Sequence, residues 1–152
     1  MIFISHRGNT DGKVTDRENT EDYILEAISM GYDVEIDAWL VGCDLYLGHD
    51  APIHHTDLSF LSKHCDKLWI HCKNIPALHH LVALEELNVF FHDTDDVVLT
   101  SKKYLWTYPG KNIDTDKSVC VLPEISEYET INCHGICSDY IKKYYDEYGQ
   151  SI

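Results

Sequence analysis

The sequence predicts an α/β fold built on one mostly parallel sheet. Short apolar runs alternate with segments of helical periodicity along most of the chain. Polar and charged residues follow these apolar runs directly, as expected where parallel strands end in functional loops. The length of 152 residues suits one domain with a sizeable core and is short for two. We therefore expect residues 1–152 to form a single domain.

The first part of the chain predicts a βαβ unit. Met1–Ser5 is a short apolar run that leads into a turn at Gly8. A helix is expected to begin after Thr20 and to end at Gly31, and the next strand covers Val34–Leu40. This order of strand, loop, helix and strand brings the two strands together in parallel.

The middle of the chain predicts two further strands and a short helix. Leu45–Leu47 is an extended segment, Ala51–His55 is a loop, and Leu68–Lys73 is a buried strand with polar groups at its end. Thr56 or Asp57 can cap a short helix between the loop and the strand. Strands and helices therefore continue to alternate through this region.

The second half of the chain begins with a helix that we expect to be the longest. Asn74 caps this helix, which extends to Leu87, and the strand Asn88–Phe91 follows it. The further extended segments are Val97–Thr100, Tyr104–Tyr108, Ser118–Leu122 and Gly135–Asp139. Apolar residues at helical spacing over Ile141–Tyr148 predict a closing helix.

Two connections in this half are too short for a regular repeat of strand and helix. Thr94–Asp96 and Gly110–Lys117 fall below the roughly dozen residues that a parallel crossover takes. A regular eight-stranded β/α barrel also takes about 250 residues. Either several outer helices are missing, or some neighbouring strands run antiparallel.

Charge and hydropathy restrict the expected partners. The chain has 12 basic and 26 acidic residues, a formal charge of −14, which argues against binding to nucleic acid or to anionic lipid by bulk electrostatics. An anionic substrate must therefore meet a local cation. No run approaches the roughly 20 apolar residues of a membrane span, and the N-terminus lacks the features of a secretory signal. We expect a cytoplasmic protein with no stable membrane insertion and no nucleic-acid partner.

Glu35 and Asp37 are the first candidate functional residues. They alternate with Val34, Ile36 and Ala38, so a strand places both carboxylates on one face and the apolar residues on the other. Two acids on one strand face usually indicate a cation site. On their own they would equally fit the solvated face of an edge strand, so their neighbours decide the interpretation.

Four short motifs in the first third of the chain occur together. They are His6-Arg7-Gly8, Glu18-Asn19-Thr20, Glu35-Ile36-Asp37 and Gly48-His49-Asp50. In this order and spacing they resemble the glycerophosphodiester phosphodiesterase family. That family belongs to the phospholipase C-like phosphodiesterase superfamily, which includes sphingomyelinase D-like enzymes. Weaker similarities follow at Trp69–Lys73, Trp106-Thr107 and His134–Asp139. The chain resembles a short, divergent member.

The resemblance implies a compact or reduced TIM-type (β/α) barrel, with several outer helices shortened or missing, and a metal-dependent phosphoric diester hydrolase. It also implies three functional pairs: His6 and His49 for acid–base catalysis, Arg7 and Lys73 for substrate phosphate, and Glu35 and Asp37 for Mg²⁺ or Ca²⁺. This set agrees with the chemistry. A hard cation and an Arg fork neutralise charge on phosphoryl oxygens, and two imidazoles can remove and deliver protons near neutral pH.

One residue departs from the family pattern. His71 stands where the family has a third carboxylate ligand, and imidazole is a poorer partner for Mg²⁺ than a carboxylate. Glu18, Asp93, Glu124 or water would then complete the metal shell, or the site would prefer Mn²⁺ or Zn²⁺. Trp106 is expected either in the core or in the pocket wall.

Three functions stay open at this point. The first is hydrolysis of a glycerophosphodiester or related small phosphodiester. The second is a sphingomyelinase D-like lyase reaction that releases a cyclic phosphate. The third is a catalytically weakened barrel that binds a phosphorylated ligand, which the replacement at His71 favours. A barrel with few helices would also expose apolar strand faces, which favours a homodimer.

Overall fold

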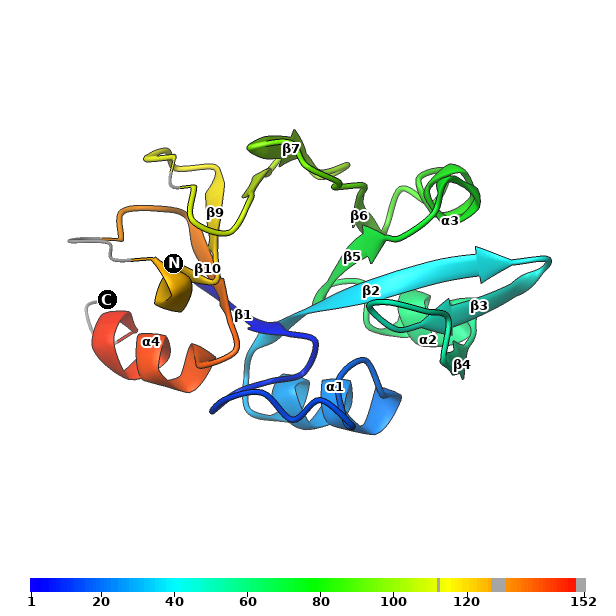
Figure 1. The fold of residues 1–152 in the computed structure, drawn as a ribbon, viewed down its shortest axis with the longest axis horizontal. Coiled ribbons are helices and arrows are strands. Elements are labelled where there is room, and N and C mark those ends of the chain that lie inside the picture. Colours follow the sequence, from blue (N-terminus) through cyan, green and yellow to red (C-terminus); the bar gives the residue numbers. More distant parts are fainter. Residues whose placement is uncertain (112, 127–130, 150–152) are drawn as a thin grey trace.

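The computed structural model describes residues 1–111, 113–126 and 131–149. It confirms the α/β class: the strands form one curled mixed sheet, with helices outside the curl (Figure 1). The strands are β1 (Ile2–His6), β2 (Asp33–Val41), β3 (Asp44–Leu47), β4 (His54–Thr56), β5 (Leu68–Cys72), β6 (Asn88–Phe90), β7 (Val97–Leu99), β8 (Leu105–Thr107), β9 (Ser118–Val121) and β10 (Gly135–Ser138). The helices are α1 (Glu21–Ser29), α2 (Leu58–Lys63), α3 (Ile75–Leu81), α4 (Ile141–Tyr148) and the 3₁₀ helix η1 (Pro123–Ile125).

Most of the sheet is parallel and its strands curl into a half-barrel. The parallel neighbours follow the order β6, β5, β2, β1, β10, β9 and β8. β7 adds antiparallel to β8, and the β3–β4 hairpin extends antiparallel from the end of β2. Within the described residues no ladder joins β6 to β7. The two ends approach at Val89 and Ser101, where Ser101 N donates to Val89 O at 2.8 Å.

The outer face of the sheet packs against the helices. Val34, Ile36 and Ala38 of β2 are fully buried there, together with Ile24 of α1 and Leu61 of α2. Helices of six to nine residues are marginal on their own, so this apolar contact is what stabilises them. The predicted apolar face of β2 is therefore the face toward the helices.

The inner face is apolar near the start of the strands and polar near their ends. The inner apolar cluster consists of Ile4, Trp69, Phe90, Trp106, Val119, Val121 and Cys137. Because side chains of a strand repeat every two residues, the next inward residues are polar: His6, His71, His92, Tyr108 and Asp139. The apolar cluster thus closes one end of the curl and leaves a polar ring at the other.

Helices cover only part of the outer face. α4, α1, α2 and α3 lie outside β10, β1, β2, β5 and β6, which we call the helix-backed arc (Figure 1). β7, β8 and β9 form the helix-free arc. From β7 to β10, the described part of the chain contains no α-helix, and η1 is its one helical turn. The connection 110–117 joins the parallel strands β8 and β9 without an α-helix among its described residues, and the connection 94–96 leads to β7, which pairs antiparallel with β8.

Two predicted elements need correction. The helix that begins after Asn74 is not the longest, because it ends at Leu81; α1 has nine residues and α3 has seven. Turns with hydrogen bonds from Leu84 N to Leu81 O and from Leu87 N to Leu84 O redirect the chain into β6. The predicted loop 51–55 contains the start of β4, which pairs with β3. Of the two cap residues expected from the sequence, Asp57 caps α2.

None of the described helices has the combined length and apolar character that crossing a membrane requires.

Candidate active site and metal centre

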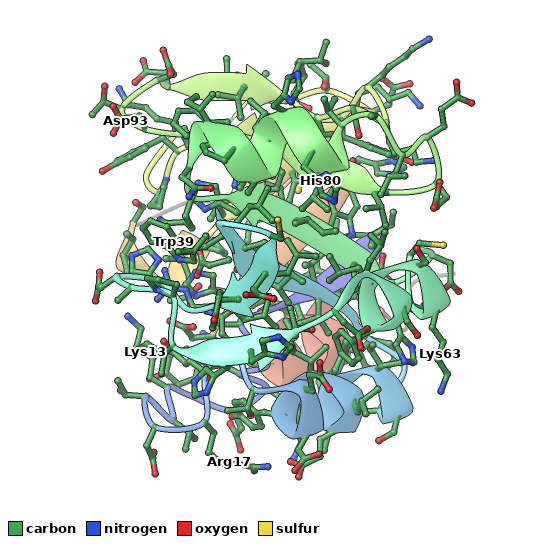
Figure 2. The ribbon with its side chains drawn as sticks, turned by 90° about the vertical axis from the view of Figure 1, so that its right-hand side faces the viewer. Lys13, Arg17, Trp39, Lys63, His80 and Asp93 are labelled. Atoms are coloured by element: carbon green, nitrogen blue, oxygen red, sulfur yellow. The ribbon has the colours of Figure 1, made fainter. Side chains whose placement is uncertain are left out.

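A cavity of about 380 Å³ lies at the carboxyl ends of the parallel strands. Its wall contains His6, Arg7, Glu35, His49, His71, Lys73, His92, Asp93, Trp106, Tyr108, Pro109, Val121 and Leu122. Figure 2 shows Asp93, Trp39 and Lys13, from distant parts of the sequence, along the same edge of the molecule. The carboxyl edge is where parallel sheets usually carry their functional groups.

Strand register brings the central charged residues together. In the pairing of β2 with β5, Glu35 lies beside Trp69 and Asp37 lies beside His71. Lys73 continues the same inward alternation after the end of β5. Two adjacent strands therefore supply one acid, one imidazole and one ammonium group to a single wall of the cavity, and the fully buried Asp37 lies beside His71 in the same sheet.

Glu35, Asp37 and His71 can hold a metal ion. One donor atom from each lies within 4.8 Å of the others. His71 Nδ1 is 3.2 Å from Asp37 Oδ1 and 3.9 Å from Glu35 Oε1. Buried carboxylate oxygens normally have partners, yet Glu35 Oε2 and Asp37 Oδ1 have no hydrogen-bond partner. A cation would neutralise both, so the residues present fit a divalent ion.

The two carboxylates have opposite pKa shifts. Burial, and then the charge of Asp37, raise the pKa of Glu35 well above its ordinary value. Burial also raises the pKa of Asp37, but contacts with His49 and His71 and the charge of Arg7 outweigh it and hold that pKa well below its ordinary value. Of the two, Asp37 therefore favours the charged form and Glu35 the neutral form.

Arg7 is fixed by an unusual turn after β1. Its φ is 57°, and a Cβ on the next residue, Gly8, would lie 2.6 Å from a ring carbon of Tyr23. The guanidinium forms an ion pair with Asp37 at 3.0 Å and donates to Glu18 at 3.3 Å. This contact with Asp37 falls short of hydrogen-bond alignment, because Arg7 Nε has no hydrogen-bond partner. Arg7 therefore keeps N–H groups for an anion in the cavity.

His49 is placed beside Arg7 by a glycine. Gly48 has a φ of 147°, and a Cβ there would lie 2.1 Å from Ala51 O. His49 Nδ1 lies 2.7 Å from Arg7 Nη2 and 3.2 Å from Asp37 Oδ2. One nitrogen cannot accept from Arg7 and donate to Asp37 at the same time. Because a guanidinium can only donate, the shorter contact assigns the proton of the neutral ring to Nε2. Trp39 Nε1 donates to Gly48 O at 2.6 Å and helps to hold this loop.

His6 is oriented by a carboxylate from the far end of the chain. His6 Nδ1 donates to Asp139 Oδ1 at 2.7 Å, and Asn9 Nδ2 donates to the same oxygen at 2.8 Å. His6 Nε2 is then the unprotonated nitrogen of the neutral ring, 3.8 Å from Glu35 Oε2. Burial raises the pKa of Asp139, but the hydrogen bond and charge of His6 outweigh this and lower it below its ordinary value.

The structure brings together most of the residues proposed from sequence, but two have other positions. His6, Arg7, Glu35, His49, His71, Lys73 and Trp106 line the cavity, as does Asp93. Glu18 does not contribute to the described wall; it accepts hydrogen bonds from Arg7 and Asn9. Glu124 accepts from Ser138 Oγ and Asp139 N, so it supports Asp139 rather than the metal cluster. Neither is placed to complete the metal shell.

Sequence reasoning assigned no role to several residues of the site. Asn19 adopts a φ of 61° and donates to Asp37 Oδ2 at 3.0 Å, while its own Oδ1 accepts from Asp37 N. Asp139 orients His6, and its position at the end of the last predicted strand could have indicated it. His92 and Tyr108 likewise follow strands. Their partners are distant in sequence, so spacing alone did not identify them.

No family model, no curated protein and no solved structure matches this chain.

Proposed function

We propose that this protein is a small metal-dependent phosphodiesterase with a reduced (β/α) barrel as its single domain, acting on a glycerophosphodiester or related phosphodiester. One observation carries the proposal: the anion-binding groups Arg7 and Lys73 share one cavity with two imidazoles and a buried carboxylate cluster. A bare anion site would not need Glu35 and Asp37, and a metal site alone would not need Arg7.

Arg7 and Lys73 would bind the phosphate. The side chain of Arg7 is 14 % exposed, and its hydrogen bonds to Glu18 and His49 leave further N–H groups for phosphate oxygens. Lys73 Nζ lies 3.7 Å from Asp37 Oδ1 and supplies a second positive charge. Both cations compensate the repulsion that a strongly acidic chain exerts on an anion.

His6 and His49 are suited to complementary proton transfers. Because Asp139 holds the Nδ1 proton of His6, its Nε2 can accept a proton from the attacking hydroxyl group or water. Because Arg7 donates to Nδ1 of His49, the Nε2 proton of that ring can pass to the leaving oxygen. A divalent cation held by Glu35, Asp37 and His71 would stabilise negative charge on the phosphoryl oxygens.

The test is turnover by the purified protein of a panel of glycerophosphodiesters and lysophospholipids, with Mg²⁺, Ca²⁺, Mn²⁺, Zn²⁺ or EDTA. His6→Ala and Glu35→Ala are compared with His80→Ala, a matched control because His80 is exposed on α3 (Figure 2). We expect cation-dependent turnover that is lost in the first two variants and kept in the control. Circular dichroism checks that each variant is folded.

The products separate the alternative functions. Release of a cyclic phosphate would show that the same site catalyses the lyase reaction instead of hydrolysis. Tight binding of a phosphodiester without turnover in the presence of any metal would contradict the enzymatic function and support the function as a module that binds a phosphorylated ligand. The observation that favours this last alternative is that His71 occupies the position of an expected acid.

The proposal extends to the setting of the protein. We place the enzyme in the cytoplasm, as a homodimer with a small-molecule substrate and without a nucleic-acid partner. The outer surface of the helix-free arc exposes Leu99, 63 % accessible, and offers the dimer contact. A monomer mass by light scattering at micromolar concentration would contradict the dimer.

A further inference from the structure

The His71 ring is held in one orientation by two independent contacts. His71 Nε2 lies 3.1 Å from the backbone carbonyl oxygen of His92. The ring also stacks on Phe90, with centroids 5.2 Å apart and planes 6° from parallel. A ring fixed in this way loses little conformational entropy when it binds a ligand.

The contact with His92 determines which nitrogen carries the proton. A carbonyl oxygen can only accept a hydrogen bond, so His71 Nε2 must donate. The neutral ring then has its lone pair on Nδ1. Metal-binding histidines commonly have this arrangement, with the nitrogen opposite the metal donating to a carbonyl or carboxylate.

The lone pair on His71 Nδ1 faces the acidic cluster. Asp37 Oδ1 is 3.2 Å away and has no hydrogen-bond partner, so their contact is not a hydrogen bond. Glu35 Oε1 is 3.9 Å away. Lys73 Nζ lies 3.7 Å from Asp37 Oδ1, so an ammonium group already offsets part of the negative charge beside these three donors. An ion about 2.1 Å from each ligand has ligand–ligand distances of about 3.0–3.4 Å. The separation of His71 Nδ1 and Asp37 Oδ1 falls in this range, and Glu35 Oε1 must move closer to His71 to join them on an ion.

We propose that Glu35, Asp37 and His71 select a transition-metal dication of the Mn²⁺ to Zn²⁺ series over Mg²⁺ and Ca²⁺, with His71 Nδ1 as the nitrogen ligand. The inference rests on the metal site of the proposed function. Imidazole suits these ions, whereas Mg²⁺ and Ca²⁺ prefer oxygen donors and would find only two carboxylates here.

Metal binding without substrate tests the inference. Protein stripped with EDTA is titrated calorimetrically with Zn²⁺, Mn²⁺, Mg²⁺ and Ca²⁺, and Co²⁺ is used as a probe because its visible absorption reports nitrogen ligation. We expect Zn²⁺ and Mn²⁺ to bind more than about tenfold more tightly than Mg²⁺. His71→Gln should weaken Zn²⁺ binding by roughly tenfold or more, and His71→Glu should move the preference toward Mg²⁺.

His80→Ala is the control for adventitious binding to exposed imidazoles, and it should leave the affinities unchanged. Equal affinity for Mg²⁺ and Zn²⁺, no transition-metal binding, or a preference that His71→Glu does not change would overturn the inference. Selective binding of Zn²⁺ or Mn²⁺ without any turnover would instead contradict the proposed enzyme and leave the metal site standing. If His71→Gln does not fold, His71→Glu and the wild-type selectivity still decide.

Discussion

The two arcs of the sheet contribute different residues to the cavity. In the helix-backed arc, apolar residues such as Ile36 and Ile70 pack outward against helices, and Glu35 and Lys73 line the cavity on the inner side. In the helix-free arc, the cavity-lining residues include Trp106, Tyr108 and Val121. The outward residues there include Thr107 and Ser118, which are polar and buried, and Leu99, which is exposed.

The difference follows from where each strand can bury apolar surface. A strand covered by a helix gains its hydrophobic stabilisation on the outer face, so its inner face can carry charges. A strand without a helix must gain that stabilisation inside the curl. The cavity therefore has a charged wall from one arc and an apolar wall, with Trp106 and Val121, from the other.

The largest expected effect is at the centre of the charged wall. Asp37→Ala removes one of the two carboxylates, with Glu18, that form ion pairs with Arg7, and breaking such a buried pair costs about 3–5 kcal/mol. Urea unfolding measures the loss. Asp93→Ala, at an exposed position on the cavity rim, is the matched control and should change stability by less than about 0.5 kcal/mol. Similar losses in both variants would contradict the assigned role of Asp37.

Two leucines test the outer faces of the arcs directly. Leu61→Ala, in the helix α2, removes a fully buried side chain and should cost about 2–5 kcal/mol. Leu105→Ala, half-buried in β8 of the helix-free arc, should cost about 1 kcal/mol. Both are measured by urea unfolding. Equal losses would mean that the helices are not the main source of stability on the outer face.

Asp139 tests how far the charged wall depends on a residue outside the metal cluster. Asp139→Asn removes the carboxylate that holds the Nδ1 proton of His6, so turnover should fall by roughly a hundredfold if the proposed function is right. The pH–rate profile should also shift, because His6 loses a charged partner. Unchanged turnover and an unchanged profile in a folded, active preparation would exclude the positioning role.

The ionised Glu35 side chain is expected to lower the free energy of unfolding of the metal-free protein. Its folded-state pKa lies above the ordinary value of 4.5, so stability decreases as pH rises from 4.5 through the folded-state pKa. Glu35→Gln should therefore raise the free energy of unfolding in EDTA by about 1 kcal/mol at pH 8 and leave it nearly unchanged at pH 4. Urea unfolding of the wild type and of Glu35→Gln at the two pH values measures this difference. A loss of stability at pH 8 would contradict the raised pKa.

The smallest effect is expected at the edge of the site. Lys13 is 60 % exposed at its side chain, and Lys13 Nζ lies 3.6 Å from Asp139 Oδ2. Lys13→Ala should lower stability by less than about 1 kcal/mol, because water and salt screen such a pair. The difference should decrease further when unfolding is repeated in high salt. A loss as large as that of Asp37→Ala would show that the surface pair matters as much as the buried one.

Local sequence patterns predicted the α/β class and most of the strands, because alternation and helical periodicity are set by neighbouring residues. They also predicted that Glu35 and Asp37 share one strand face; in the structure Glu35 lines the cavity, and the buried Asp37 meets it in the same carboxylate cluster. The failures were of a different kind. The end of the helix after Asn74 depends on how the chain must turn to reach β6, and the pairing of β4 depends on β3.

The sequence by itself determined which polar residues stand at the end of each strand. It also determined which of them share a face of the sheet, because side chains alternate between the two faces with a period of two residues. Only the tertiary structure decided which of them meet. Asp139 reaches His6 because β10 lies beside β1, although 133 positions separate them in the chain. His71 has its protonated nitrogen toward His92 because β6 lies beside β5. Strand order depends on long-range burial, and no short segment contains that information.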